Sequence, residues 1–501
     1  MGSCFCKVPF LMCNQTGGCM QKNLDSFFTI TKSIAPIVRS IMSAGGTAYL
    51  VGGSVRDIVL GRELKDFDIE VHGLTIEALE TVLSSFGIVI LVGKQFGVLR
   101  ISSYDIDWSI PRKDSVGRKP TVELDPSMTI EIACRRRDVT MNAMAIDLGY
   151  IVEHYDDLYQ KSMQNKLAVT TDFCIVDPYN GLDALAKKQL RAVDKILFLE
   201  DPLRFYRVMQ FIGRFDMIPD DTLDVICKSM DLSGLARERI WEEIKKLFLK
   251  SSYPSLGFRW LQKIGRLNEI FPELHALIGL QQPQEYHPEG DVFEHTMQSL
   301  DAAAQQKLYR DDHEKMIIML AVLCHDLGKA TTTTSDARAL GHEDASVDLG
   351  KKLLCRLTDQ QDVCKTVGKL VRYHMLPGQF IAENASLKAY KRLAIKLAPE
   401  TSLYQLMLVC LADRQGRNGS SSKPLPCDQS FYDAFFHQAS QASVIHNAEP
   451  PVLQGRDLLD VFTPGPQMGK ALALAYQLQI EEEITDSQEL KRRVLEMLIQ
   501  K

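Results

Sequence analysis

The sequence predicts an α+β protein, with a small mixed-sheet head followed by an all-α body. Two observations predict this class. In about the first 150 residues, short apolar runs of strand length follow one another, whereas beyond Asp183 apolar residues recur at helical spacing almost throughout. The chain of 501 residues is also too long for one compact core, so roughly three or four folding units are expected.

The head is predicted to begin with a helix from Phe27 to Met42, where apolar residues recur at helical spacing. A second helix is predicted from Thr75 to Phe86, with Gly87 as its stop, and it would cover the sheet. The runs that predict strands are Ala48–Val51, Phe67–Val71, Ile88–Val92, Val98–Ile101 and Ile106–Ile110.

The body is predicted to be helical, with breaks at several prolines. The Ser-rich stretch from Gly416 to Lys423 predicts a loop, and a last helical segment is expected from Lys470 to the end. The expected divisions are a disordered leader at 1–25, the head at 26–150, a neck at 151–220, a helical body at 221–282, a further helical domain at 283–425 and a helical tail at 426–501.

Composition excludes some classes of protein. An apolar content of 45% with no run long enough to span a bilayer predicts a soluble, cytoplasmic protein without a membrane partner. The twelve cysteines show no zinc-site spacing, so reduced thiols are expected. The net charge of -6 argues against non-specific coating of nucleic acid, so any RNA site must be a local basic patch. Three clusters are candidates, although any single one is more often a solvated face: Arg112–Arg118–Lys119, Arg135–Arg136–Arg137 and Arg204–Arg207–Arg214.

A phosphate-binding loop is predicted at Gly52, Gly53 and Ser54, which follow a strand and precede a helical stretch. Glycines let the backbone approach phosphate oxygens, the following helix offers unpaired N–H groups, and Arg56 can add a charge-assisted pair of hydrogen bonds. Taken alone this signal is weak, because Gly-Gly turns after strands are common and are usually only structural.

Carboxylates follow this loop. Asp66 and Asp68 alternate along the second strand, so they point to one face about 7 Å apart at Cα. Asp107 on a later strand is the candidate for a third carboxylate, and Asp105 is the runner-up. Acids beside a phosphate loop suit Mg²⁺ and two-metal nucleotidyl transfer, although an isolated D-x-D is more often a solvated strand end.

The ordered motifs of the head resemble those of class II tRNA nucleotidyltransferases and the related bacterial poly(A) polymerases. They are Gly52–Asp57, Leu60–Arg62, Asp66–Asp68, Arg136–Ala145, Asp177–Gly181 and Glu200–Arg204. The family usually has a second Gly in place of Asn180. The resemblance implies a nucleotidyltransferase head that uses Mg²⁺, with tRNA, CTP and ATP as partners. It also implies that Arg137 and Asp138 contact sugar and phosphate.

Selection of C and A can be explained by Asp201 and Arg204, which are three residues apart and would share a helix face. The carboxylate can accept from the exocyclic amine of either base, and the guanidinium can donate to the ring nitrogen; uracil and guanine mismatch both contacts. The alternative is an ordinary surface ion pair. The resemblance agrees, because the family uses this element as its amino-acid template. Arg207, one turn further, could reach the triphosphate, and Gln210 stands where many relatives have Arg.

The stretch from Arg112 to Thr129 corresponds to the family's flexible loop, which helps the switch from CTP to ATP, so it favours complete CCA addition. Residues 453–470 resemble the family's C-terminal tail, which is expected to hold the tRNA elbow.

The segment 283–425 resembles the HD phosphohydrolase superfamily. The residues that carry the resemblance are His295, His325, Asp326 and Asp413, which would bind Ni²⁺, Mn²⁺, Co²⁺ or Mg²⁺ and activate water against a phosphoester. In relatives with this domain the implied activities are phosphatase and 2′,3′-cyclic phosphodiesterase. His342 and His374 lie between these positions and are equally well explained as core histidines or as ligands.

The expected function is therefore addition of C, C and A to tRNA 3′ ends without a template, by a monomer or a homodimer. The alternatives are a poly(A) polymerase, a partial CC- or A-adding enzyme, or a metal phosphohydrolase whose head only binds RNA or nucleotide.

Overall fold

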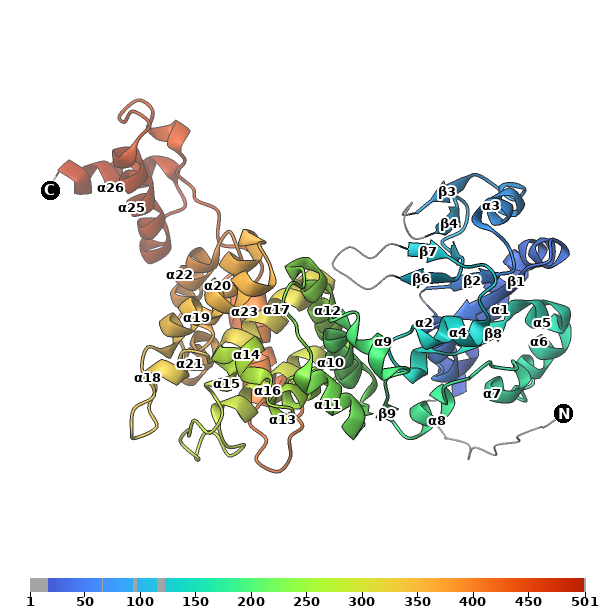
Figure 1. Cartoon of the computed structure of the whole chain (residues 1–501). Helices are drawn as coiled ribbons and strands as arrows, with labels where there is room; N and C mark the ends of the chain where they lie inside the picture. The colour runs from blue at the N-terminus through green and yellow to red at the C-terminus, as the bar shows by residue number, and fades with distance from the viewer. Residues whose placement is uncertain (1–16, 65, 93–96, 115–121, 500–501) are drawn as a thin grey trace. The chain divides into compact units, whose positions relative to one another are not determined.

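The computed structural model describes residues 17–499 apart from residues 65, 93–96 and 115–121 (Figure 1). It divides into a first unit that ends at Leu235 and a second that begins at Ala236. In the part of the chain that is described, no helix has the length and apolar character needed to cross a membrane.

The centre of the first unit is a mixed sheet with strand order β3-β4-β5-β2-β1-β8. Its strands are β1 (Thr47–Val51), β2 (Asp68–His72), β3 (Val89–Leu91), β4 (Val98–Ile101), β5 (Asp107–Ser109) and β8 (Ala145–Asp147). Strands β2 and β5 are parallel and the other neighbours are antiparallel. The five predicted strands are confirmed to within two residues at each end, while β8 was not predicted.

Helices cover this sheet, and Figure 1 shows α3 beside β3 and β4. The helices of the first unit are α1 (Gly17–Ser43), α2 (Gly53–Val59), α3 (Ile76–Ser84), α4 (Ile130–Arg135), η1 (Thr140–Asn142), α5 (Leu148–Glu153), α6 (Tyr155–Met163), α7 (Val169–Asp172), α8 (Gly181–Ala186), α9 (Lys195–Leu199), α10 (Leu203–Phe215) and α11 (Asp221–Ser229). Beyond Asp183 a parallel pair, β9 (Gln189–Leu190) and β10 (Ile218–Pro219), interrupts the otherwise helical pattern.

The first helix corrects the prediction of a disordered leader at 1–25. Helix α1 already begins at Gly17, ten residues before the predicted start, and its buried face includes Leu24. Residues 1–16 of the predicted leader lie outside the described residues. On the same face of α1, the rings of Phe27 and Phe28 pack against Phe173 and fix the helix to the head.

The predicted flexible loop, Arg112 to Thr129, is described only at its two ends. There β6 (Arg112–Asp114) and β7 (Val122–Leu124) pair antiparallel, and residues 115–121 lie outside the described residues. The ends of the segment are therefore held together as a two-stranded ribbon.

The second unit is helical in all its described residues that form regular structure, as predicted. Its elements are α12 (Arg237–Lys250), α13 (Ser255–Lys263), α14 (Leu267–Ile270), α15 (Pro272–His275), α16 (Val292–Gln305), α17 (Asp312–Cys324), α18 (Lys329–Thr332), α19 (His342–Leu357), α20 (Gln361–Tyr373), α21 (Leu376–Ala382), α22 (Leu387–Leu397), α23 (Leu403–Gln415), α24 (Gln429–Gln441), η2 (Gly455–Leu458), α25 (Pro466–Glu482) and α26 (Ser487–Ile499). Helices α16, α17, α20 and α23 pack on one another and form the core that carries the second candidate site.

The tail differs from the single helix predicted from Lys470 to the end. It consists of α25 and α26, because Glu483 takes a left-handed conformation with φ +57° and ends α25. Leu453, Met468 and Leu490 pack between the two helices as a small separate core. The Ser-rich segment 416–423 is a loop between α23 and α24, as predicted.

Candidate active sites

The predicted phosphate loop joins β1 to α2. Gly52 has φ +74°, a conformation that favours glycine, and a Cβ there would overlap the Nη1 atom of Arg137. The Ser54 hydroxyl donates to the backbone oxygen of Asp66 over 3.0 Å. The loop is thus joined to the segment that carries the first predicted carboxylates, and a guanidinium lies directly against it.

Arg56 makes contacts within the head that the sequence did not predict. Its side chain is buried, with Nη1 donating to Asn142 over 2.6 Å and Nε donating to Asp57 over 2.9 Å. The guanidinium also lies 4.4 Å from the centre of the Phe215 ring. These contacts hold α2 in position, and a phosphate contact from Arg56 stays a prediction.

The three predicted carboxylates come together where two adjacent central strands of the sheet begin. Asp68 begins β2 and is the register partner of Asp107 on β5, while Asp66 precedes β2, separated from Asp68 by the buried Phe67. Asp105, the runner-up, precedes β5 and has a side chain 90% exposed. Asp107 is therefore the better candidate for the third carboxylate.

The electrostatics of this cluster favour a cation. Partial desolvation raises the pKa of Asp68, and the nearby charges of Asp66 and Asp107 raise it further, while Arg137 opposes them. Arg100 binds Asp107 through Nε at 2.8 Å and Nη2 at 2.7 Å. Converging carboxylates are the oxygen donors that divalent metal ions prefer, so the residues present fit Mg²⁺.

Asp138 and Arg207 bind each other. The Asp138 carboxylate is buried and accepts from Arg207 Nε at 2.6 Å, from Asn142 at 2.9 Å and from the backbone N–H of Val139 at 2.8 Å. Burial alone would raise the pKa of Asp138, but Arg207 and these hydrogen bonds lower it to about 2. Asp138 is therefore ionised at neutral pH and orients Arg207.

The pair predicted to select the base differs from prediction in one respect. Arg204 lies on α10, but Asp201 precedes that helix, and its carboxylate accepts from the backbone N–H of Leu203 at 3.2 Å. A proline disfavours the helical conformation of the residue before it, and Pro202, at the start of α10, has this effect on Asp201. The two residues still adjoin, because the backbone N–H of Arg204 donates to the backbone oxygen of Asp201 at 3.0 Å.

The guanidinium of Arg204 is fixed by two backbone carbonyls. It donates to Leu197 at 2.8 Å and to Arg136 at 2.6 Å. Burial lowers the pKa of Arg204 from its usual value, while Asp138 and Asp201 oppose this shift. These contacts also join two of the basic clusters seen in the sequence, 135–137 and 204–214.

Asn180 stands where the family usually has Gly, and its backbone explains the preference. It has φ +58°, which Asn tolerates better than other residues with a side chain. At the following Gly181 a Cβ would overlap the backbone oxygen of Thr140 and meet Met144. Glycine is needed at 181 for space, whereas Asn at 180 is an acceptable replacement.

The second predicted site lies among the helices of the second unit. His295 is on α16, His325 and Asp326 follow α17, and Asp413 is on α23. His295 Nε2 lies 2.9 Å from Asp413 Oδ1 and 3.7 Å from Asp326 Oδ2, and His325 Nε2 lies 3.3 Å from Asp326 Oδ2. All four side chains are buried. The fold therefore brings together, in its interior, the set of residues that the sequence predicted.

The ring orientations of the two histidines fit metal binding. His295 Nδ1 is bound to the Glu289 carboxylate at 2.7 Å and His325 Nδ1 to the Val322 carbonyl at 2.7 Å, so each Nε2 faces the carboxylates. Burial alone would lower the pKa of His295, but Asp413 and Glu289 raise it to about 9. Burial likewise opposes ionisation of Asp326, yet His325 and Lys329 hold its pKa well below the usual range.

Three polar residues around this site were missed. Glu289 orients His295, Lys329 Nζ lies 2.7 Å from Asp326 Oδ2, and Arg417 Nη2 lies 3.1 Å from Asp413 Oδ1. Lys329 and Arg417 follow the acids by three and four residues, a spacing that places them on the same side of a helix and could have indicated them. Glu289 lies in a loop, and no sequence pattern indicates it.

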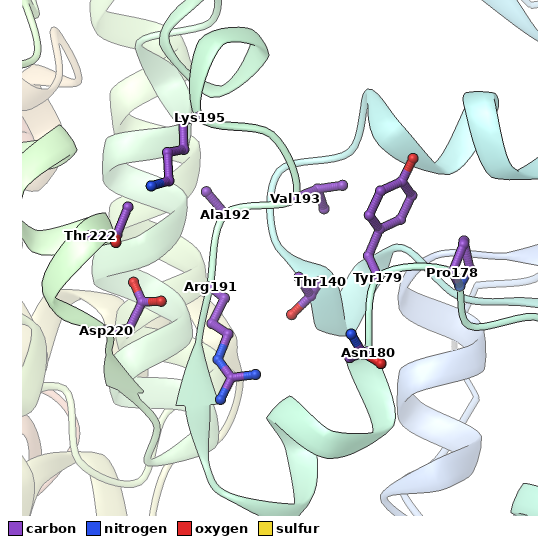
Figure 2. Close-up of a pocket in the computed structure, with 10 residues that line it drawn as sticks. All are labelled: Thr140, Pro178, Tyr179, Asn180, Arg191, Ala192, Val193, Lys195, Asp220 and Thr222. Atoms are coloured by element: carbon purple, nitrogen blue, oxygen red, sulfur yellow. The ribbon is translucent and has the colours of Figure 1, made fainter. Parts of the chain in front are cut away.

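Figure 2 shows a separate pocket in the first unit, lined by Tyr179 and Asn180, by Arg191 and by Asp220, among others. None of the predicted site residues lines it. Arg191 is already bound to Asp183 at 3.1 Å, so its charge is partly neutralised. The pocket therefore adds nothing to the two candidate sites.

Comparison with family models gives three matches along the chain. Residues 48–191 match the Poly A polymerase head domain, 217–278 the probable RNA and SrmB-binding site of polymerase A, and 292–415 the HD domain.

Curated relatives match over most of the chain. The multifunctional CCA protein of Pasteurella multocida (strain Pm70) is 32% identical over 421 residues, which is 81% of this chain and 91% of that protein. The multifunctional CCA protein of Alkalilimnicola ehrlichii is 31% identical over 434 residues, covering 83% and 94%.

Solved structures share the fold. The Bacillus stearothermophilus CCA-adding enzyme in complex with CTP has a TM-score of 0.62 at 18% identity, covering 94% of this chain and 98% of that one. The Thermotoga maritima CCA-adding enzyme complexed with tRNA has a TM-score of 0.54 at 17% identity, covering 96% and 98%.

Proposed function

This chain belongs to the family of multifunctional CCA proteins, and we propose that it adds C, C and A to the 3′ ends of tRNA from CTP and ATP without a nucleic-acid template. The observation that carries the proposal is the convergence of Asp66, Asp68 and Asp107 beside Gly52 and Arg137. A triphosphate needs both cation ligands and a positive charge at this place, and the head supplies both.

The three carboxylates would hold Mg²⁺, which lowers the pKa of the attacking 3′-hydroxyl and neutralises the triphosphate when bound. Other residues would position the substrate. The backbone at Gly52 permits close approach of the phosphates, and Arg137, whose guanidinium lies against Gly52, would bind them. Asp138, ionised and buried, holds Arg207 ready for a further contact.

Asp201 and Arg204 would select the base. The guanidinium of Arg204 is fixed by two carbonyls, so it can donate in a set direction to the bare ring nitrogen of cytosine or adenine. The carboxylate of Asp201 would accept from the exocyclic amine. Uracil and guanine present a carbonyl and a ring N–H instead, so both contacts would be lost and left desolvated, at a cost of a few kcal/mol.

A second activity is supported by the site on the HD domain. His295, His325, Asp326 and Asp413 would hold Ni²⁺, Mn²⁺, Co²⁺ or Mg²⁺, which activates water against a phosphoester when bound. Lys329 and Arg417 lie beside the two acids and would bind the phosphate. The substrates proposed are phosphate monoesters and 2′,3′-cyclic phosphates, such as those at damaged tRNA 3′ ends.

The test uses three tRNA transcripts that end before CCA, after the first C and after CC, with labelled CTP and ATP and with Mg²⁺. Complete CCA ends are expected on all three. Addition of A alone, or of C alone, would mean a partial enzyme, and long A tails on an unrelated RNA would mean a poly(A) polymerase. No incorporation on any transcript would contradict the proposal.

Two variants separate the activities. Asp68→Ala is expected to abolish incorporation and to spare hydrolysis of a 2′,3′-cyclic phosphate, whereas His325→Ala is expected to do the reverse. Loss of both activities in either variant would contradict the assignment of two independent sites.

A further inference from the structure

We infer that Glu70 is a positioning residue for nucleotide addition: its carboxylate holds the guanidinium of Arg137 at the phosphate loop, and His72 in turn fixes that carboxylate. The inference rests on the proposed function in that Arg137 binds the triphosphate there. Neither Glu70 nor His72 was among the residues that the sequence predicted for the site.

Glu70 lies on the strand that begins with a predicted metal ligand. Strand β2 starts at Asp68, and side chains alternate along a strand, so Glu70 points to the same face of the sheet as Asp68. Its Oε2 atom lies 4.0 Å from Nη2 of Arg137, while Nη1 of the same guanidinium lies against Gly52. One nitrogen of Arg137 therefore faces Glu70 and the other faces the phosphate loop.

The carboxylate of Glu70 is held on its other side by His72. The Nε2 atom of His72 lies 3.0 Å from Glu70 Oε1, and its Nδ1 atom lies 2.7 Å from the backbone oxygen of Met128. The ring of Tyr49, on the neighbouring strand β1, meets the His72 ring edge to face, with 5.3 Å between the ring centres. Because His72 is buried and has these three contacts, it gives the Glu70 carboxylate a set position.

Glu70 keeps its negative charge although it is largely buried. Burial alone would raise the pKa of Glu70, but the hydrogen bond with His72 and the charge of Arg137 lower it. Among the described residues, Glu70 is the one acid that forms an ion pair with Arg137. A fixed and ionised carboxylate at this distance, in a site with little water, limits the directions in which the guanidinium can turn.

Without this ion pair, Arg137 has competing partners. Burial raises the pKa of Asp68 and the charge of Arg137 opposes that shift, while Asp66 and Asp107 add negative charge to the same region. A guanidinium that Glu70 did not hold would be drawn towards these carboxylates and away from the phosphates. Glu70 thus preorganises Arg137 for binding, so its loss should weaken CTP binding more than it slows the chemical step.

The test replaces Glu70 by Gln, which keeps the size of the side chain and an oxygen for His72 but removes the charge. The substrate is a transcript that ends before CCA. The KM and the dissociation constant for CTP are expected to rise about tenfold, with kcat changed less than about twofold, because a guanidinium that is not held loses part of its contact with the phosphates. Glu131→Gln removes an exposed acid of α4 and should change none of these values. Melting temperatures show that each variant is folded.

A second measurement asks whether Glu70 acts through Arg137. Arg137→Ala is expected to raise the dissociation constant for CTP, and adding Glu70→Gln to it should raise that constant no further. Independent, additive increases would overturn the positioning role, and so would an unchanged dissociation constant in Glu70→Gln alone. His72→Gln should raise the constant in the same direction, and the absence of a rise would remove His72 from the inference.

Failure of the proposed function would give different results. An unmodified protein that binds CTP but does not incorporate it would contradict the proposed function, and the dissociation constants would still test the inference. An unmodified protein that binds no CTP would overturn both. Arg137→Ala without any effect on CTP binding would overturn the role proposed for Arg137 and, with it, the role of Glu70.

Discussion

Asp68 on β2 and Asp107 on β5 are register partners on adjacent parallel strands, so their side chains leave the sheet at the same level. The parallel pairing is what brings a carboxylate from late in the head beside the D-x-D pair. Asp107 is also held by Arg100, which binds Asp105 at 2.9 Å as well.

Replacing Asp107 by Asn is expected to lower kcat for nucleotide addition roughly 10²- to 10³-fold, because a metal ligand contributes several kcal/mol to the transition state. The measurement is single-turnover incorporation of labelled CTP. Asp105→Asn is a matched control, since it also removes a partner of Arg100 but lies outside the cluster. An equal loss in both variants would mean that Arg100, not the third carboxylate, is what matters.

Much of this site could be predicted from the sequence because its signals are local. Alternation along a strand gave Asp66 and Asp68, and the apolar run around Trp108 placed Asp107 on a strand. The pairing of β2 with β5 could not be predicted, since it depends on which strands meet in the sheet. The burial of Arg56 was missed for the same reason, because its partners Asn142 and Phe215 are distant in sequence.

The HD domain shows a second limit of sequence reasoning. A histidine packed in a core and a histidine that binds a metal can have the same sequence neighbours, so His342 and His374 could not be assigned. Only the three-dimensional arrangement shows that their Nε2 atoms face Asp326 and that, within the described part of the chain, they have no hydrogen-bond partner.

Replacing Asp201 by Asn is expected to raise incorporation of UTP relative to CTP about tenfold or more. The amide can donate to the carbonyl that uracil carries in place of the cytosine amine, and one such contact is worth about 1–3 kcal/mol. The comparison is made on a transcript that ends before CCA. Glu200→Gln removes the same charge from the neighbouring residue and should leave the ratio unchanged. If it raised the ratio equally, the effect would be one of charge and not of a base contact.

The stability of the second unit is expected to depend on Asp301, which accepts from the N–H and hydroxyl of Ser255 at 2.9 Å and 2.6 Å. Burial raises the pKa of Asp301 to about 7; the Ser255 hydrogen bonds and Arg259 oppose this shift, and Glu294 adds to it. At pH values between the ordinary pKa of an Asp and about 7, Asp301 is therefore protonated in the folded chain but ionised in the unfolded chain. The stabilisation that this proton gives is fully present at low pH and is lost as the pH rises to about 7.

The side-chain amide in the Asp301→Asn variant does not titrate. It still offers Ser255 an oxygen that accepts a hydrogen bond and an N–H that donates one. The melting temperature of the unchanged protein, relative to this variant, should fall between about pH 5 and pH 7 and then level off. A difference that does not change over this range would show that Asp301 is ionised throughout.

Gly52→Ala tests whether Arg137 binds the triphosphate. A Cβ at 52 would displace the Arg137 guanidinium, so the KM for CTP is expected to rise about ten- to a hundredfold, as for loss of a charged hydrogen bond. Alanine is also strained at positive φ, and Gly45→Ala controls for this, since Gly45 has φ +87° but open space around its Cβ position. Both variants should lose stability, but only Gly52→Ala should change KM. An unchanged KM in Gly52→Ala would show that Arg137 does not bind the triphosphate. Backbone strain affects both glycine positions, so strain alone cannot explain a change in KM that only Gly52→Ala shows.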